Sequence, residues 1–279
     1  MDKIIQYMID EDLGFKDITT DALITPEKIA KAKIISKDTG IIAGIDVAIS
    51  IFKEYNLEID TFKEDGDKVS IGDSILEING SAKDILSLER TVLNLMMRMS
   101  GIATITSKLI SKVKNKGLNV KIAGTRKTSP ALHKFDKMAI AIGGGDTHRF
   151  RLDDMVLIKD NHIAVVGSVG KAIERAKKNC SFTKKIEIEV ETIDDAILAS
   201  SSGANIIMLD NMIPMEIKKA LTILKEKNLR DNILIEVSGG INENNLLEYA
   251  ETGVDIISLG FITHSFKSLD ISLKVELKI

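Results

Sequence analysis

The feature that most constrains the fold is a repeated alternation of short apolar runs with amphipathic segments, which begins at Leu118. The runs are rich in β-branched residues and almost continuously apolar, as strands covered on both faces are. The segments between them have apolar residues at helical spacing, and we expect helices over Val166–Lys178, Ile193–Ser202, Pro214–Lys227 and Glu243–Thr252. The expected strands are LNVKIAG (118–124), DMVLIKD (154–160), KIEIEVE (185–191), NIIMLDN (205–211), NILIEVSGG (232–240) and VDIISLG (254–260). With right-handed crossovers, about six such parallel strands predict an open, incomplete α/β barrel.

The first 115 residues have a different pattern. Short strands are expected in AKIISKD (32–38), IIAGIDVAI (41–49) and DKVSIGDSILEI (67–78), separated by turn pairs such as Asp65–Gly66. A long helix is expected from Ala82 to about Lys114. The predicted fold class is therefore α/β, with an N-terminal α/β sandwich domain (1–115, including the long connecting helix) followed by a barrel domain (116–265). A strand within 266–279 is expected to return to the first domain.

Composition excludes several classes of partner. The net charge of −3 gives no basic field for nucleic acid or an anionic membrane surface. A single cysteine, Cys180, suits a reducing compartment. The longest apolar stretch, Ile41 to Phe52, is interrupted by Asp46 and is too short to cross a bilayer. Acidic residues lie where a signal peptide would have none. These features predict a cytoplasmic protein with no membrane or nucleic-acid partner.

Polar residues follow each expected barrel strand, at the end where α/β barrels build their active sites. They are Thr125–Arg126, Lys159–Asp160, Glu189, Asp210, Ser238–Gly239–Gly240 and Gly260. Three of the seven arginines (Arg126, Arg149 and Arg151) lie in one segment with His133, His148 and His162. Clustered arginine favours planar, bidentate recognition of an anion, although a solvated loop would have a similar composition. His162 is interpreted as a structural histidine.

The glycine turns predict a phosphate site. Ser238–Gly239–Gly240 precedes a helix with Asn242 as its expected N-cap, and Gly260 ends the neighbouring strand. Backbone N–H groups of such turns can approach a phosphate closely, but a tight turn without ligand has the same sequence.

Glu189 and Asp210 end consecutive strands, so their carboxylates can meet. They can hold magnesium or accept hydrogen bonds from sugar hydroxyls, or form an ion pair with Lys127 or Lys159. The whole set predicts a cavity for a substrate with several negative charges, at least one of them a phosphate.

The segment TRKTSPALHKFDKMAIAIGGGDTHRFRLDDMVLIKDNHI (125–163) resembles the signature of the quinolinate phosphoribosyltransferase family. The resemblance covers nearly the whole chain and extends to ERTVLNLMMRMSGIAT (89–104), EIEVET (187–192), IIMLDN (206–211), EVSGGI (236–241) and SLGFITHS (258–265). It implies an enzyme, a pentosyltransferase that converts quinolinate and phosphoribosyl pyrophosphate, with magnesium as cofactor, to nicotinate mononucleotide, pyrophosphate and carbon dioxide in NAD biosynthesis. The implied fold is an α/β sandwich followed by an open barrel.

The resemblance also implies roles for individual residues. Lys127, Lys159, Glu189 and Asp210 would be catalytic, with Glu189 and Asp210 near the ribose hydroxyls and magnesium. The quinolinate carboxylates would lie among Arg126, Lys127, His148 and Arg149, and Lys159 would face the pyrophosphate. Thr125 would be a further substrate-binding residue. The 5′-phosphate would be held by Ser238, Gly239, Gly240 and Gly260, and His264 would be a further substrate-binding position. Arg90 would reach into the site of a neighbouring subunit, so a homodimer or higher oligomer with shared active sites is expected.

Two other functions fit parts of the pattern. A molybdenum-transport-associated homologue shares the fold and the GTRKT turn but usually lacks the pair found here as Lys159–Asp160. A non-catalytic phosphosugar-binding sensor would be supported by loss of Lys159 or Glu189, and both are present. The chain departs from the family pattern at Ala131, where glycine is usual, and at His133 and Arg151.

Overall fold

The computed structural model describes residues 2–276, and their contacts divide the chain into two compact units. Unit 1 comprises the described residues of Met1–Ser107, Thr128–Gly144 and Ser265–Ile279, and unit 2 comprises Lys108–Lys127 and Gly145–His264. The domain limits 1–115 and 116–265 remain a prediction. No helix within residues 2–276 combines the length and the apolar character needed to cross a membrane.

Unit 1 is built on an antiparallel sheet with the strand order β12-β1-β5-β3. Alternate residues of β1, from Ala30 to Ser36, are buried, so one face of the sheet is covered. The strand β12 pairs with β1 from Lys31–Glu276 to Ser36–Ile271, whereas residues 277–279 of the expected strand lie outside the described residues. The strands are β1 (Ile29–Ser36), β3 (Glu58–Thr61), β5 (Ser74–Ser81) and β12 (Ile271–Glu276), with a separate pair formed by β2 (Gly40–Ile41) and β4 (Lys68–Val69).

One expected strand of unit 1 is wrong. The stretch IIAGIDVAI (41–49) forms the end of β2 and the start of a helix, α3 (Ile45–Glu54). Gly44 adopts a left-handed conformation (φ 96°) at its N-terminus. Ile45, Ala48, Ile51 and Phe52 are buried along one side, at helical spacing. The apolar run is short enough to suit either element, and only the residues after it reveal the helical period.

Among the remaining helices of unit 1, α4 and α5 are joined by a buried ion pair. These remaining helices are α1 (Lys3–Leu13), α2 (Ile18–Leu23), α5 (His133–Ile142) and the first part of α4 (Ala82–Lys114), a helix that continues into unit 2. Arg98 on α4 contacts Asp136 on α5 through two hydrogen bonds, Nε–Oδ1 at 2.7 Å and Nη2–Oδ2 at 2.8 Å. Asp136 is completely buried, so this pair satisfies a carboxylate that would be costly to leave alone.

Unit 2 contains a six-stranded, all-parallel sheet with the order β6-β11-β10-β9-β8-β7. The strands β6 and β7 form its two edges, so the barrel is not closed and the predicted α/β fold class is confirmed. After unit 1 contributes residues 128–144, the chain rejoins β6 at Asp146, which exchanges two backbone hydrogen bonds with Ile122 and Gly124. The strands are β6 (Lys121–Gly124), β7 (Val156–Ile158), β8 (Ile186–Val190), β9 (Ile206–Asp210), β10 (Leu234–Ser238) and β11 (Ile256–Leu259).

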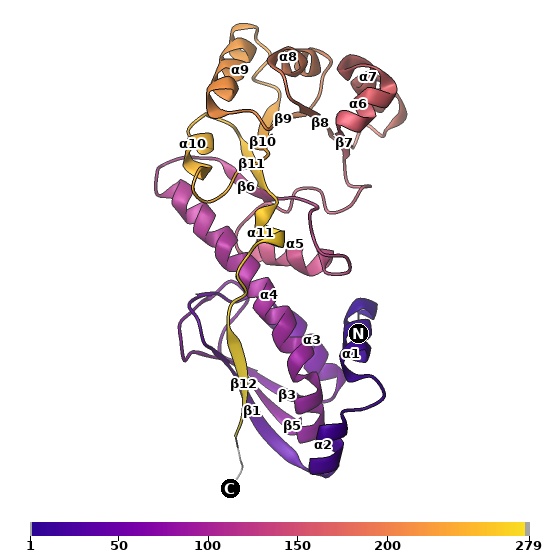
Figure 1. Cartoon of the computed structure of the whole chain (residues 1–279), viewed down its shortest axis with the longest axis vertical. Helices are drawn as coiled ribbons and strands as arrows, with labels where there is room; N and C mark the ends of the chain where they lie inside the picture. Colours follow the sequence, from indigo (N-terminus) through magenta and orange to yellow (C-terminus); the bar gives the residue numbers. More distant parts are fainter. Residues whose placement is uncertain (1, 277–279) are drawn as a thin grey trace. The chain divides into compact units, whose positions relative to one another are not determined.

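Helices cover the outer face of this sheet, where Figure 1 shows α7, α8 and α9 beside the strands they connect. Ser168 and Thr192 accept the capping hydrogen bonds of α7 and α8, and Pro214 begins α9. The helices are α6 (Asp160–Val166), α7 (Val169–Asn179), α8 (Ile193–Ser201), α9 (Pro214–Glu226), α10 (Leu246–Ala250) and α11 (Phe261–His264). Asn242 is not an N-cap as expected, because α10 begins only at Leu246 and the Asn242 side chain accepts from the Asn244 N–H within a turn.

Candidate active site

The two-residue period of the strands separates apolar from polar side chains in unit 2. Ile188, Ile207, Ile235 and Ile257 are completely buried on one face of the sheet. On each of these strands, the residues at even offsets from one another share the other face. That second face carries Glu187 and Glu189 on β8, Met208 and Asp210 on β9, Glu236 and Ser238 on β10, and Ser258 on β11. The polar residues therefore converge because the strands are parallel and their carboxyl ends meet.

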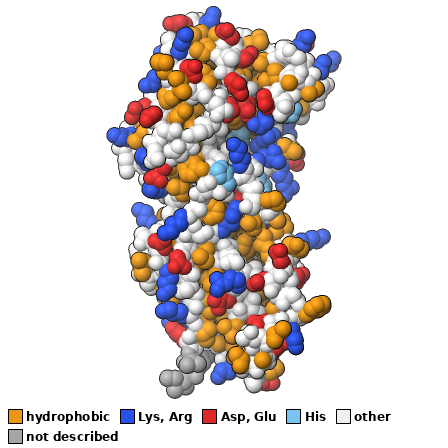
Figure 2. Space-filling model, in the orientation of Figure 1, with side chains coloured by type: hydrophobic (Ala, Val, Ile, Leu, Met, Phe, Trp, Pro, Cys, Tyr) orange, Lys and Arg blue, Asp and Glu red, His pale blue; other side chains and the backbone are white. Residues whose placement is uncertain are grey.

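This face opens into a cavity of about 300 Å³. Nine of the expected site residues line it: Thr125, Arg126, Lys127, His148, Arg149, Lys159, Glu189, Asp210 and Ser238. The other lining residues are Gly124, Leu157, Met208, Glu236 and Ser258. In the space-filling view, blue Lys and Arg side chains gather beside pale blue His side chains (Figure 2). The sequence thus identified most of the polar wall of one cavity.

Arg126 and Arg149 place positive charge at the cavity. Among residues 2–276, neither guanidinium forms an ion pair with a carboxylate. Burial and the nearby charge of Arg126 lower the pKa of Arg149 from its ordinary value. The two neighbouring guanidinium groups repel one another, and a bound dianion would relieve this repulsion.

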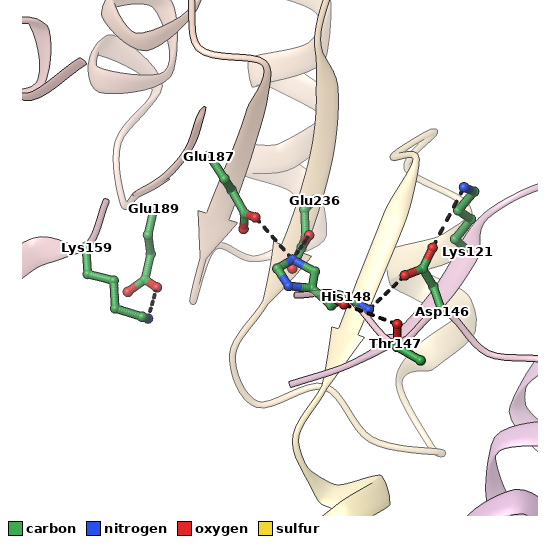
Figure 3. A network of polar contacts seen from close by, with 8 residues as sticks. All are labelled: Lys121, Asp146, Thr147, His148, Lys159, Glu187, Glu189 and Glu236. Atoms are coloured by element: carbon green, nitrogen blue, oxygen red, sulfur yellow. Dashed lines mark hydrogen bonds and ion pairs between the residues drawn. The ribbon is translucent and has the colours of Figure 1, made fainter. Parts of the chain in front are cut away.

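His148 lies at the cavity as expected, but it also makes contacts that its sequence position does not reveal. Its backbone has φ of 52°, in the left-handed region, and its Nε2 lies 3.1 Å from Oε2 of Glu187 and 3.1 Å from Oε2 of Glu236 (Figure 3). Both glutamate side chains are completely buried. Burial alone would lower the pKa of His148, but the hydrogen bonds and charges of the two glutamates raise it to about 10.

Glu187 and Glu236 were missed as site residues, although a signal was present. Each lies two positions before an expected site residue on the same strand, Glu189 and Ser238, and therefore on the same face. His148, Glu187 and Glu236 also bring three possible metal-ligand atoms within 4.8 Å of one another. A protonated imidazole would have no lone pair with which to bind a metal, and would itself be the cation between the carboxylates.

Glu189 and Asp210 end β8 and β9 at the rim of the cavity. Glu189 forms an ion pair with Lys159 (Figure 3), one of the alternatives that the sequence left open. Burial, followed by the charge of Glu189, raises the pKa of Asp210. Two neighbouring carboxylates that repel one another and face a cavity have the hard oxygen donors that magnesium prefers, so these residues fit a magnesium ion.

The glycine turns after β10 and β11 are closely packed. Gly239 has φ of 94°, and a Cβ atom there would lie 2.2 Å from Oδ1 of Asn211, so only glycine fits. A Cβ on Gly260 would lie 3.1 Å from Cδ of Lys127 and 3.2 Å from Nε2 of His264. Gly260, His264 and Lys127 therefore lie together, next to the cavity that Lys127 lines.

Two expected site residues and two other histidines complete the set. Gly240 has open space at its Cβ position (φ 63°). Arg90 lies on α4 in unit 1, where its side chain is 60% exposed and forms an ion pair with the adjacent Glu89, at 3.7 Å. His162 accepts a hydrogen bond from the backbone N–H of Lys159 and has the structural role expected of it. His133 pairs with the hydroxyl of Thr128 at 2.9 Å.

Two family models match the chain in succession. The N-terminal domain of quinolinate phosphoribosyl transferase matches residues 17–100, and its C-terminal domain matches residues 102–274. The chain belongs to the quinolinate phosphoribosyltransferase family. A family member from Methanothermobacter thermautotrophicus, named as a probable nicotinate-nucleotide pyrophosphorylase (carboxylating), is 50% identical over 98% of each chain. The human nicotinate-nucleotide pyrophosphorylase (carboxylating) is 33% identical over 92% of this chain and 86% of its own.

Solved structures of the family agree with this assignment. The crystal structure of NadC from Streptococcus pyogenes superimposes with a TM-score of 0.91 at 36% identity, covering 99% of this chain and 96% of that one. A quinolinate phosphoribosyltransferase fold therefore underlies the cavity described above, and the resemblance inferred from the sequence motifs is confirmed.

Proposed function

We propose that this chain transfers the phosphoribosyl group of phosphoribosyl pyrophosphate to the ring nitrogen of quinolinate and releases carbon dioxide. The products are nicotinate mononucleotide and pyrophosphate, and the reaction belongs to NAD biosynthesis. The observation that carries the proposal is the convergence of Arg126, Arg149 and His148 on the same cavity as Glu189 and Asp210. Three cations match the two neighbouring carboxylates of quinolinate, and two carboxylates match a ribose and its metal ion.

The sugar phosphate would lie along the strand ends. Backbone N–H groups of the turn Ser238–Gly239–Gly240, with Gly260 beside it, are suited to the 5′-phosphate, since glycine leaves room for close approach. Helix N-termini contribute little here, because α10 and α11 have only five and four residues. Glu189 and Asp210 would hold the ribose hydroxyls and magnesium, which when bound neutralises part of the charge on pyrophosphate.

The first chemical step breaks the bond between the sugar and pyrophosphate. As the pyridine nitrogen attacks the anomeric carbon, positive charge grows on the ribose and negative charge grows on the departing pyrophosphate. The ammonium groups of Lys159 and Lys127 would stabilise the leaving group more strongly in the transition state than in the ground state. When the ion pair between Lys159 and Glu189 opens, Lys159 would contact the pyrophosphate and Glu189 would contact the ribose.

The second step is the loss of carbon dioxide. Once the ring nitrogen carries ribose it is positively charged, and it can stabilise the electron pair left on the ring carbon when the adjacent carboxylate departs. A proton must then add to that carbon, and Lys127 and water are the candidate donors. Arg126, Arg149 and His148 would keep hold of the remaining carboxylate, which stays on the product.

The two alternative functions have less support. Two relatives at 50% identity carry the pyrophosphorylase name rather than a transport-associated one. A binding protein without activity would not need Lys159 and Glu189 at the cavity, where both lie. We also propose a cytoplasmic location, no nucleic-acid or membrane partner, and a homodimer or higher oligomer whose subunits share active sites through Arg90.

The test is to mix the purified chain with quinolinate, phosphoribosyl pyrophosphate and MgCl₂ and to follow nicotinate mononucleotide by chromatography. One carbon dioxide should form for each nucleotide, and EDTA should stop the reaction until Mg²⁺ is restored. Lys159→Ala should abolish product formation, whereas Lys178→Ala, on the exposed side of α7, should not. Absence of nicotinate mononucleotide with the folded wild-type chain would contradict the proposal.

A further inference from the structure

Two buried glutamates outside the expected ligand set aim at one ring nitrogen of His148. Glu187 comes from β8 and Glu236 from β10, and Figure 3 shows both carboxylates pointing toward Nε2. Each Oε2 atom lies 3.1 Å from Nε2, and both side chains have no exposed surface. The strands β8 and β10 flank β9 in the sheet, and their two carboxylates would repel one another in this position without a cation between them.

The hydrogen bonds around the glutamates are incomplete without that cation. The N–H of Nε2 is directed at Glu236 Oε2, so it cannot also satisfy Glu187. Within residues 2–276, both oxygens of Glu187 and Oε1 of Glu236 are buried without a hydrogen-bond partner. Arg149 is the other positive group that acts on Glu187. A positive charge on the imidazole is therefore the main compensation for two desolvated carboxylates.

Because the carboxylates contact Nε2 of His148, the protonation of the ring determines which hydrogen bonds Nδ1, the other ring nitrogen, can form. No hydrogen bond to Nδ1 is formed among the described residues, and this nitrogen lies on the side of the ring away from the glutamates (Figure 3). A neutral imidazole that donates from Nε2 carries a lone pair on Nδ1, which would repel a substrate carboxylate. Only the imidazolium donates from both nitrogens.

We propose that Glu187 and Glu236 are positioning residues that hold His148 as an imidazolium, so that Nδ1–H donates to a carboxylate of the substrate. This inference rests on the proposed function for the identity of the dicarboxylate, but the charge state of His148 does not depend on it. The glutamates act through His148 and do not touch the substrate. The pKa of about 10 for His148 agrees with this arrangement.

The test compares Glu187→Gln and Glu236→Gln with the wild-type chain. Glutamine keeps the shape and can still accept a hydrogen bond from Nε2, but it removes the charge. In ¹⁵N-histidine NMR without substrate, both ring nitrogens of wild-type His148 should stay protonated from pH 6 to pH 9. In the glutamine variants the ring should become neutral within this range, closer to the ordinary histidine pKa of about 6.5.

The affinity for quinolinate, measured by calorimetry, should depend on the charge of the His148 ring. The wild-type affinity should be nearly constant between pH 6 and pH 8.5. In each glutamine variant the affinity should fall by ~10-fold or more over the same range, because the proton on Nδ1 is lost. Glu226→Gln makes the same chemical change on the exposed surface of α9 and should behave as wild type.

Three outcomes would overturn the inference. They are a neutral wild-type ring at pH 8, glutamine variants that remain imidazolium at pH 9, and a stoichiometric shift of the Nε2 signal on adding ZnCl₂, which would make the cluster a metal site. If the variants do not fold, the wild-type spectrum alone still shows whether His148 is an imidazolium. If the ring behaves as expected but quinolinate does not bind to the wild-type chain, the proposed function fails and the charge state stands.

Discussion

Several residues near the cavity have backbone conformations that most side chains avoid. His148 and Asn211 have φ of 52° and 55°, and Gly239 has φ of 94° against the side chain of Asn211. A non-glycine residue in the left-handed region costs roughly 1–2 kcal/mol. At His148, interactions with Glu187 and Glu236 oppose that cost. Strain of this kind is typical of sites where a side chain must be aimed at a ligand.

Ala131 has the same strain without an evident benefit. It has φ of 64° and is exposed. Ala131→Gly should raise the free energy of unfolding by about 0.5–1 kcal/mol, because the relief of left-handed strain exceeds the entropy that glycine adds to the unfolded chain.

Urea denaturation of Ala131→Gly should be compared with Ala141→Gly, an exposed change within α5. The second variant should be destabilised by about 1 kcal/mol, since glycine is a poor helix former. A loss of stability in Ala131→Gly as large as in Ala141→Gly would contradict the strain argument.

At the scale of elements, the repeating part of the chain was the easiest to predict. Each of the six barrel runs contains its strand, and the expected helix from Ala82 to Lys114 has the observed bounds. The wrong predictions lie where the apolar residues have no clear repeat. The run at 41–49 is too short to distinguish strand from helix, and the three asparagines near 242–245 allow several turns.

The same contrast applies to the site. Nine expected residues line the cavity, because strand ends in a parallel sheet must converge. Glu187 and Glu236 were missed because a glutamate within an apolar strand looks like an ordinary polar residue of an alternating pattern. Only the contact with His148 distinguishes these two. His148 lies 39 positions from Glu187 in the numbering, and no local rule connects them.

The turns after β10 and β11 give a prediction at this scale. Gly260→Ala would push a methyl group against Cδ of Lys127 and Nε2 of His264, which are side-chain atoms that can move. The fold should survive, but the affinity for phosphoribosyl pyrophosphate should drop by ~10-fold, about 1.4 kcal/mol, because the methyl group occupies the approach to the backbone. Gly239 is unsuitable for this test, since any side chain there collides with Asn211.

Calorimetry can compare Gly260→Ala with Gly170→Ala on α7. A Cβ at Gly170 makes an ordinary contact of 3.5 Å with Oγ of Ser202, so that variant should bind as wild type. Equal affinities for the two variants would locate the phosphate elsewhere.

At the level of the whole molecule, Arg90 is the residue expected to connect two subunits. This side chain is exposed on α4, and among residues 2–276 its one ion-pair partner is Glu89. If Arg90 completes the site of a second subunit, each composite site needs Lys159 from one chain and Arg90 from the other. Removing either residue should cost ~2–5 kcal/mol of transition-state stabilisation, which leaves Arg90→Ala and Lys159→Ala homodimers nearly inactive.

Mixing the two inactive variants should restore activity. A chain lacking Arg90 keeps its own Lys159 and receives Arg90 from its partner, so one of the two sites in a mixed dimer is intact. Random exchange makes about half of the dimers mixed, and activity should recover to roughly a quarter of the wild-type level. A mixture that mass spectrometry shows to contain heterodimers, yet stays inactive, would exclude a role for Arg90 across the interface.

The cationic wall of the cavity should select a dicarboxylate. The most direct measurement is kcat/KM for quinolinate and for nicotinic acid, with phosphoribosyl pyrophosphate and Mg²⁺ saturating. Nicotinic acid lacks one carboxylate and would leave part of the group Arg126, Arg149 and His148 unpaired, so the account predicts a preference for quinolinate of roughly 10⁴-fold. Comparable values of kcat/KM for the two acids would contradict it.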